Sequence, residues 1–519
     1  MTGAGLTGAS GAPGTSGVPG ARSRTLLGHP LGLATVFFTE MWERLSFYGM
    51  RALLILFLVD QVAHGGLGLD DRTAAAIYGL YVGGTYLSCL PGGWIGDRLL
   101  GSQRAVLIGG IVITIGHLLL GVAPSSQVFF FGLLVIVVGT GLLKPNSAAI
   151  VAQLYPEGGA RRDAGFTIYY IGINVGATLG PLVAGVLAVR YGWPAGFMTA
   201  AVGMAAGVVQ FLWGRRLLGA AGREPMSASG DAVPAAASTG RPQRAALRWL
   251  ALAVVALLVL VALLWNGTLH AAPVPLQALA TQAVIAIVIL YFGYLLFGAG
   301  LTRVERLRVV AVVVLFTASV MFWAGYEQTG SSLNLFAERY TDRHLLGWQI
   351  PATFFQALNP IFIVVFGSVF SALWVLLARR GLDPSTTLKF VLALLGMGAG
   401  FVVMAAAARL VVTGHLAGIG WLTVTYLLHT LAELCLSPVG QSVVTKLVPE
   451  RFCSQSLGVW LVSLSLGNLL AGRIAGNFDP TDLAAMPGQF MFIFWFAAIS
   501  AALLALSMPL MRRWMSGVH

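Results

Sequence analysis

Charged side chains crowd one otherwise apolar stretch near the amino terminus. Glu40, Glu43, Arg44, Tyr48 and Arg51 lie within twelve residues of sequence. At about 100° per residue, a helix places all five on an arc of about 140°. Groups of this kind bind charged ligands or exchange protons, and a purely structural set of ion pairs is the alternative. Because lipid cannot solvate such a face, it must look toward a protein interior.

Polar residues that would share a helix face or lie within a predicted span recur further along the first half of the chain. Lys144 is followed by Pro145, which removes a helical hydrogen bond and bends the chain beside a lone ammonium. That combination is typical of a binding site near the middle of a membrane. Tyr170 and Asn174, spaced i,i+4, offer donors and acceptors to a polar ligand, although hydrogen bonding between helices explains these two nearly as well.

The second half carries isolated acids beside aromatic or hydroxyl residues. Trp323 and Glu327 are spaced i,i+4, as are Glu433 and Ser437, which precede the helix-bending Pro438. The basic residues therefore belong to the first half and the lone acids to the second. This polarity suits a zwitterion held between the halves, and a dipeptide has such opposite ends.

The elements that must position these groups are membrane helices. Of the 519 residues, 57% are hydrophobic and only 10% are charged. Apolar runs of the ~20 residues that cross ~30 Å of hydrocarbon recur along the chain. The sequence predicts an all-α integral membrane protein of fourteen spans, near residues 33–60, 74–97, 104–123, 127–152, 165–189, 195–217, 248–266, 276–298, 309–336, 350–378, 387–411, 418–447, 456–474 and 488–511.

These spans divide into two six-helix bundles with an extra pair between them. The predicted divisions are a disordered tail (1–30), the first bundle (31–217), a breaker-rich linker (218–246), the extra helices (247–299), the second bundle (300–512) and a second tail (513–519). Most of the 31 Lys and Arg residues fall in loops on one side, which places both termini and the linker in the cytoplasm. The membrane topology therefore explains the net charge of +12, and the charge does not indicate nucleic-acid binding.

Ionisable residues inside a bilayer are costly. An Arg, Lys or Asp at a helix centre costs ~2.5–3.5 kcal/mol on insertion scales, so such groups persist only when they pair or line a wet cavity. The groups deep in predicted spans are Glu40, Glu43, Arg44, Arg51, Lys144, Glu327 and Glu433. We interpret them as functional.

Two motifs resemble the proton-dependent oligopeptide transporter family, a branch of the major facilitator superfamily. The stretch from Glu40 to Tyr48, EMWERLSFY, is similar to the family's ExxERFxYY, and the stretch from Phe166 to Gly176 is similar to its FYxxINxG. The resemblance extends from Thr39 to Met511. It implies the superfamily fold and proton-coupled symport of di- and tripeptides by alternating access, with the proton gradient in place of a cofactor. The extra helix pair resembles bacterial members and implies a bacterial inner membrane.

The resemblance also implies roles for individual residues. The peptide carboxylate end would contact Arg51, Lys144 and Asn174, and the amino end Glu433, with Asn359 a weaker polar candidate. Three tyrosines would contact the peptide backbone, namely Tyr48, Tyr86 and Tyr170. Three further residues would shape the side-chain pockets, namely Trp323, Trp460 and Ser437.

Proton coupling would fall to Glu40, Glu43, Arg44 and Lys144, with Glu327 pairing alternately with Arg51 or Lys144. A carboxylate beside a cation holds its proton weakly, and one that loses its partner in a dry site holds it tightly. A substrate carboxylate competes for the same cations, so proton and peptide binding become linked.

In the loop GGWIGDRLLGSQR, Asp97 and Arg98 would lock the closed inner gate.

Two residues depart from the first motif: Leu45 replaces a phenylalanine and Phe47 replaces a tyrosine, which removes one hydroxyl. No histidine lies near Tyr86, so coupling should need no histidine switch. We assign His117 and His429 structural roles.

Other function classes fit less well. A related transporter of nitrate, amino acids or drug-like molecules remains the alternative within transport. An intramembrane enzyme is disfavoured because the chain has no HExxH or GxGD motif, and its three cysteines show no metal-ligand spacing. A channel would need repeated charged or carbonyl rings. The expected partners are peptides, protons and lipid, with no metal and no obligate protein partner.

Overall fold

A computed structural model describes residues 25–225, 272–478 and 482–515, with scattered positions between 248 and 266. The helices of the first half are α1 (Gly32–Val59), α2 (Asp71–Ile95), α3 (Ser102–Gly121), α4 (Ser126–Gln153), α5 (Gly159–Tyr191) and α6 (Trp193–Leu218). The remaining described helices are α8 (Pro273–Gly293), α9 (Arg303–Tyr326), α10 (Ser332–Tyr340), α11 (Leu358–Arg379), α12 (Thr386–Val412), α13 (Ile419–Leu447), α14 (Glu450–Ala475) and α15 (Met486–Trp514).

Short elements join these helices. Two-residue strands pair as β1 (Thr25–Leu26) with β2 (His29–Pro30), β3 (Thr341–Asp342) with β6 (Ala417–Gly418), and β4 (His344–Leu345) with β5 (Trp348–Gln349). The pair β3–β6 is parallel and the other two are antiparallel. The short helical turns are η1 (Val62–His64), η2 (Gly96–Leu100), η3 (Tyr294–Gly298), η4 (Glu327–Gly330), η5 (Ala352–Ala357) and η6 (Leu483–Ala485).

The helix lengths agree with a membrane protein. Within the described residues, eleven helices are long and apolar enough to cross a membrane. Helices α1 and α2, with 28 and 25 residues, are also long enough at about 1.5 Å per residue. The embedded charges of α1 keep it outside that apolar set. Every predicted span coincides with a described helical segment except the one near 248–266, which, with most of the linker and tails, lies outside the described residues.

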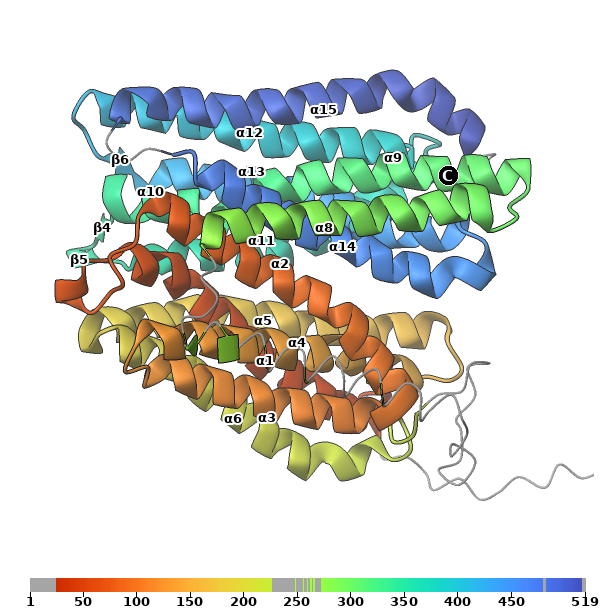
Figure 1. Cartoon of the computed structure of the whole chain (residues 1–519). Helices are drawn as coiled ribbons and strands as arrows, with labels where there is room; N and C mark the ends of the chain where they lie inside the picture. Colours follow the sequence, from red (N-terminus) through yellow and green to blue (C-terminus); the bar gives the residue numbers. More distant parts are fainter. Residues whose placement is uncertain are drawn as a thin grey trace, which may run out of the picture.

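The helices form two bundles. Figure 1 shows α1 and α3–α6 in one layer, α9 with α12–α15 in the other, and α2 running between the two layers. Helix α8, one of the extra pair, contacts α2 and α14, one helix from each bundle. The Nε2 atom of Gln277 donates to the carbonyl oxygen of Leu469 at 2.8 Å, and Ser465 Oγ donates to the carbonyl oxygen of Gly83 at 2.7 Å. Hydrogen bonds thus join α14 of the second bundle to α2 of the first bundle and to α8.

The predicted span 309–336 is not one continuous helix. Helix α9 ends at Tyr326, the turn η4 follows, and α10 begins at Ser332. Ser331 between them has φ −121° and ψ −96°, which is not helical. The break sets Glu327 at a helix end, where its side chain can reach the other bundle, as the discontinuous helices of transporters do.

Contacts between the bundles are concentrated at one end, the outer end according to the predicted topology. Arg339 of α10 forms a two-pronged ion pair with Asp71 of α2, at 2.6 and 2.8 Å. Thr353 Oγ1 donates to the carbonyl oxygen of Pro181 at 3.0 Å. At the opposite end, the side chains of Asp97 and Arg98 are exposed, and neither forms an ion pair in the part of the chain that the structure describes. The bundles are therefore closed at the end of the Asp71–Arg339 pair, which the predicted topology places outside.

The Asp71–Arg339 pair generates a prediction about this closure. We expect Asp71→Asn to increase the outward-open population about fivefold, because a partly exposed pair contributes about 1 kcal/mol. Spin labels at Val62 and Leu346, which are 72% and 99% exposed on opposite bundles, report the change as a longer distance population. Glu338→Gln is the matched control, since its partner Arg343 lies nearby in the same half. Identical distance distributions for both variants would contradict the role of the pair.

Candidate functional site

A cavity of about 1790 Å³ lies between the two bundles. Helices α1, α2, α4 and α5 line it from one side, and α9, α11, α13 and α14 from the other. It contains every residue predicted to contact a ligand, namely Tyr48, Arg51, Tyr86, Lys144, Tyr170, Asn174, Trp323, Glu327, Asn359, Glu433, Ser437 and Trp460. The fold therefore brings together residues that are more than four hundred positions apart.

One ion pair crosses from bundle to bundle at the cavity wall. Arg51 Nη2 of α1 donates to Glu327 Oε2 of η4, and Arg51 Nε donates to the Tyr78 hydroxyl at 2.5 Å. Arg51 and Glu327 are only 4% and 2% exposed. In a site this dry, removing one partner strands the other charge and costs about 3–5 kcal/mol. Of the two cations expected to alternate as partners of Glu327, Arg51 is the one engaged here.

Lys144 is an available cation on the first-bundle wall of the cavity, and Arg379 of α11 also lines the cavity. Its Nζ atom lies 4.1 Å from the centre of the Tyr86 ring, which provides a cation–π contact. It forms no ion pair with any described residue. Asn174, one helix away, donates to the carbonyl oxygen of Tyr170 at 2.8 Å, while the Tyr170 side chain is 45% exposed. The first bundle thus presents an unpaired positive charge to the cavity.

Glu433 supplies the negative charge of the opposite wall. Its Oε2 atom accepts hydrogen bonds from the Tyr326 hydroxyl at 2.7 Å and from Asn359 Nδ2 at 2.9 Å. Asn359 therefore positions Glu433 in this structure. Trp323 and Trp460 complete the neighbouring apolar wall and are buried.

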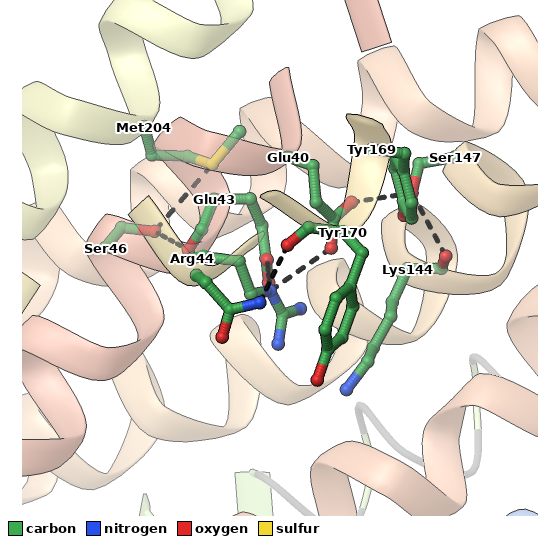
Figure 2. A network of polar contacts seen from close by, with 10 residues as sticks. Glu40, Glu43, Arg44, Ser46, Lys144, Ser147, Tyr169, Tyr170 and Met204 are labelled. Atoms are coloured by element: carbon green, nitrogen blue, oxygen red, sulfur yellow. Dashed lines mark hydrogen bonds and ion pairs between the residues drawn. The ribbon is translucent and has the colours of Figure 1, made fainter. Parts of the chain in front are cut away.

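The motif residues Glu40, Glu43 and Arg44 form a compact cluster on α1 (Figure 2). Arg44 Nε lies 3.2 Å from Glu40 Oε1 and 2.5 Å from Glu43 Oε2, as ion pairs rather than aligned hydrogen bonds. Glu40 reaches the cavity wall, whereas Glu43 and Arg44 lie behind it. Phe47 lies beside the cluster, with the Arg44 guanidinium 5.3 Å from its ring centre. Phe47 therefore makes a cation–π contact with Arg44 at the position where the motif has a tyrosine.

Several partners of these charged groups are absent from the motif-based prediction. They are Tyr78 beside Arg51, Tyr326 beside Glu433, and Ser147 and Tyr169 beside Glu40. Ser147 could have been predicted from the sequence, because it lies one helical turn after Lys144.

Within the described residues, no cluster of three His, Cys, Asp or Glu side chains could hold a metal. His117 and His429 are buried and do not line the cavity.

The bundles, the membrane-length helices and the charged cavity define a multi-pass membrane transporter of the major facilitator superfamily fold. The chain matches the profile of the POT family over residues 103–489. It is 39% identical to the peptide transporter YePEPT of Yersinia enterocolitica, over 96% of this chain and 97% of that protein. It is 34% identical to a di-/tripeptide transporter of Lactococcus lactis, over 88% and 91% of the two chains.

Solved structures agree with this likeness. A crystal structure of a peptide transporter POT in complex with sulfate superposes with a TM-score of 0.87 at 38% identity, covering 95% of this chain and 98% of that one. A POT family transporter in complex with 5-aminolevulinic acid gives a TM-score of 0.83 at 31% identity, covering 94% and 98%. The chain belongs to the POT family, a family of transporters and not of enzymes.

The ion-pair geometry depends on one glycine, which generates a second prediction. A Cβ atom on Gly330 would lie 1.6 Å from the Tyr78 hydroxyl that supports Arg51. We expect Gly330→Ala to displace this hydroxyl and destabilise the protein by about 1–3 kcal/mol. Thermal unfolding in detergent measures the loss against Gly420→Ala, where a Cβ meets nothing within 4 Å. Equal melting temperatures for the two variants would contradict the tight packing at Gly330.

Proposed function

We propose that this protein is a proton-coupled symporter that imports di- and tripeptides across a bacterial inner membrane by alternating access, with both termini in the cytoplasm. The observation that carries the proposal is the charge polarity of the cavity. Lys144 on one wall forms no ion pair with the residues that the structure describes, and Glu433 lies on the other wall. Relatives named as peptide and di-/tripeptide transporters support the same reading.

A dipeptide fits this polarity in one orientation. Its carboxylate contacts Lys144, with Arg51 and Asn174 nearby, and its ammonium contacts Glu433. Hydroxyl donors along the path hydrogen-bond the peptide backbone, namely Tyr48, Tyr86 and Tyr170. Side chains of the peptide occupy the space bounded by Trp323, Trp460 and Ser437. Binding both ends needs both bundles, so the substrate itself draws the two halves together.

Coupling follows from competition for buried cations. The substrate carboxylate competes with Glu327 for Arg51, and a carboxylate that loses its cation in a dry site takes up a proton. Breaking the Arg51–Glu327 pair also removes a link between the bundles. Glu40, Glu43 and Arg44 provide a second group of acids whose protonation changes with their pairing. Rocking of one bundle against the other then links proton and peptide transport. In the outward-open state, Asp97 and Arg98 lock the inner gate.

Uptake of labelled dialanine into proteoliposomes, driven by an inward proton gradient, tests the proposal. We expect accumulation that an uncoupler abolishes. Uptake no greater than that of the uncoupled control would contradict the proposed function. A parallel screen across peptide length and with single amino acids distinguishes a peptide transporter from a relative that carries other small solutes.

Glu43 gives a prediction that separates coupling from binding. We expect Glu43→Gln to abolish gradient-driven accumulation and to retain peptide counterflow, because exchange requires binding without net proton release. Glu157→Gln is the control, since that carboxylate is exposed and paired only with Arg161 one turn away. Loss of both activities in Glu43→Gln would indicate a structural role for the carboxylate.

Glu433 gives a prediction about substrate orientation. We expect Glu433→Gln to weaken binding of dipeptides with a free amino terminus about tenfold or more, because a buried charge-assisted hydrogen bond contributes about 1.5–3 kcal/mol. Acetylated dipeptides should lose little. Competition against labelled dialanine measures both, and equal weakening of the two peptide classes would remove Glu433 from this role.

A further inference from the structure

Two hydroxyl groups lie beside Glu40 where it borders the cavity. Ser147 Oγ of α4 donates to Glu40 Oε2 at 2.7 Å, and the same Ser147 oxygen lies 2.7 Å from the Tyr169 hydroxyl of α5. In Figure 2, Tyr169 and Ser147 overlap on one side of Glu40, and Arg44 lies on its other side. Three helices therefore contribute to one continuous line of oxygen atoms.

Glu40 borders the cavity but is almost completely buried there. Its Oε1 atom faces the Arg44 guanidinium at 3.2 Å, and its Oε2 atom is occupied by Ser147. Glu40 is 1% exposed and Ser147 is fully buried. Tyr169 is 7% exposed and lines the cavity that opens at the inner end. Oε2 is therefore the Glu40 oxygen whose hydrogen-bond partner leads on to Tyr169.

We propose that Ser147 and Tyr169 relay the Glu40 proton to the inward-open cavity. The proton on Glu40 Oε2 passes to Ser147 Oγ while the Ser147 proton passes to the Tyr169 oxygen and the Tyr169 proton passes to a water molecule. Each hydroxyl ends neutral, and one proton has moved from the carboxyl group to the cytoplasmic side. The inference rests on the proposed proton symport and deepens it by assigning the release step.

The relay depends on a hydroxyl group that the matched motif does not contain. In the FYxxINxG motif as matched here, Tyr169 occupies the position of the phenylalanine. Its hydroxyl is therefore additional to the motif, whereas Phe47 lacks the hydroxyl of the first motif. Replacing Tyr169 with phenylalanine restores the motif residue, so the variant should fold and isolate the effect of one oxygen atom.

Proton-driven dialanine uptake and peptide counterflow, each measured across external and internal pH, test the relay in Tyr169→Phe and Ser147→Ala. We expect gradient-driven uptake to slow about tenfold or more in both variants, at the low end of the effect of a positioned proton carrier. Counterflow should stay within about twofold of the unaltered protein, because it requires no net proton release. In Tyr169→Phe the pH of half-maximal uptake should be unchanged, since Ser147 still donates to Glu40.

Matched controls exist in the same chain. Tyr291 and Ser456 form a tyrosine–serine pair at 2.8 Å far from the carboxylates, so Tyr291→Phe removes an equivalent hydroxyl. Ser46 donates to the backbone oxygen of Glu43, so Ser46→Ala removes a buried hydroxyl that bonds no carboxylate. Both variants should transport at the rate of the unaltered protein.

The outcomes separate the relay from a structural role and from the proposed function. Uptake by Tyr169→Phe equal to that by Tyr291→Phe would overturn the relay while peptide symport stands. A shifted pH dependence with an unchanged maximal rate would also overturn it, because the hydroxyls would then only stabilise ionised Glu40. Absence of gradient-driven uptake in the unaltered protein would instead contradict the proposed function itself.

Discussion

The ion pair between Arg51 and Glu327 is the interaction on which the rest of this structure depends. Each group is buried, and the two come from different bundles. Leaving either charge without its partner in a medium without water has a large free-energy cost. Satisfying both requires the bundles to approach, and exchanging one partner for a ligand allows them to part. In the proposed transport cycle, the cost of a buried charge, which most proteins avoid, is the means by which binding is converted into movement.

The structure adds a set of hydroxyl groups around these charges. Tyr78 supports Arg51, Tyr326 supports Glu433, and Ser147 supports Glu40. A hydroxyl can donate to an ionised acid and accept from its protonated form, so the same partner serves both states. This property suits carboxylates whose protonation changes during a cycle, and it explains why the acids are surrounded by tyrosine and serine and not by further cations alone.

Much of the fold could be predicted from the sequence because membrane spans are specified locally. Length, apolar composition and the placement of basic residues fix where a helix crosses, and the described helices match the predicted spans closely. The break after Tyr326 was not predicted, although the polar stretch from Glu327 to Ser332, which includes Gly330, interrupts the apolar pattern there. In the fold, Tyr78 and Arg51 of the first bundle occupy the space beside Gly330.

The candidate site was predictable to a similar extent. Ionisable residues inside apolar spans are conspicuous in any sequence, and the structure gathers those predicted to contact the ligand around one cavity. Neutral partners such as Tyr169 and Tyr326 are not conspicuous, since tyrosine also packs in ordinary cores. The role of Asn359 likewise depends on which carboxylate lies within 3 Å, and that is decided by packing between α11 and α13.

The central claim is that peptide and proton binding are linked through the same buried charges. Linkage is reciprocal, so a peptide moving inward must carry protons with it even when no proton gradient is imposed. The most direct measurement is the internal pH of proteoliposomes loaded with a pH-sensitive dye when dialanine is added outside. The account predicts acidification of the interior that requires the peptide and is absent from liposomes without protein. Entry of dialanine with no change in internal pH would contradict it.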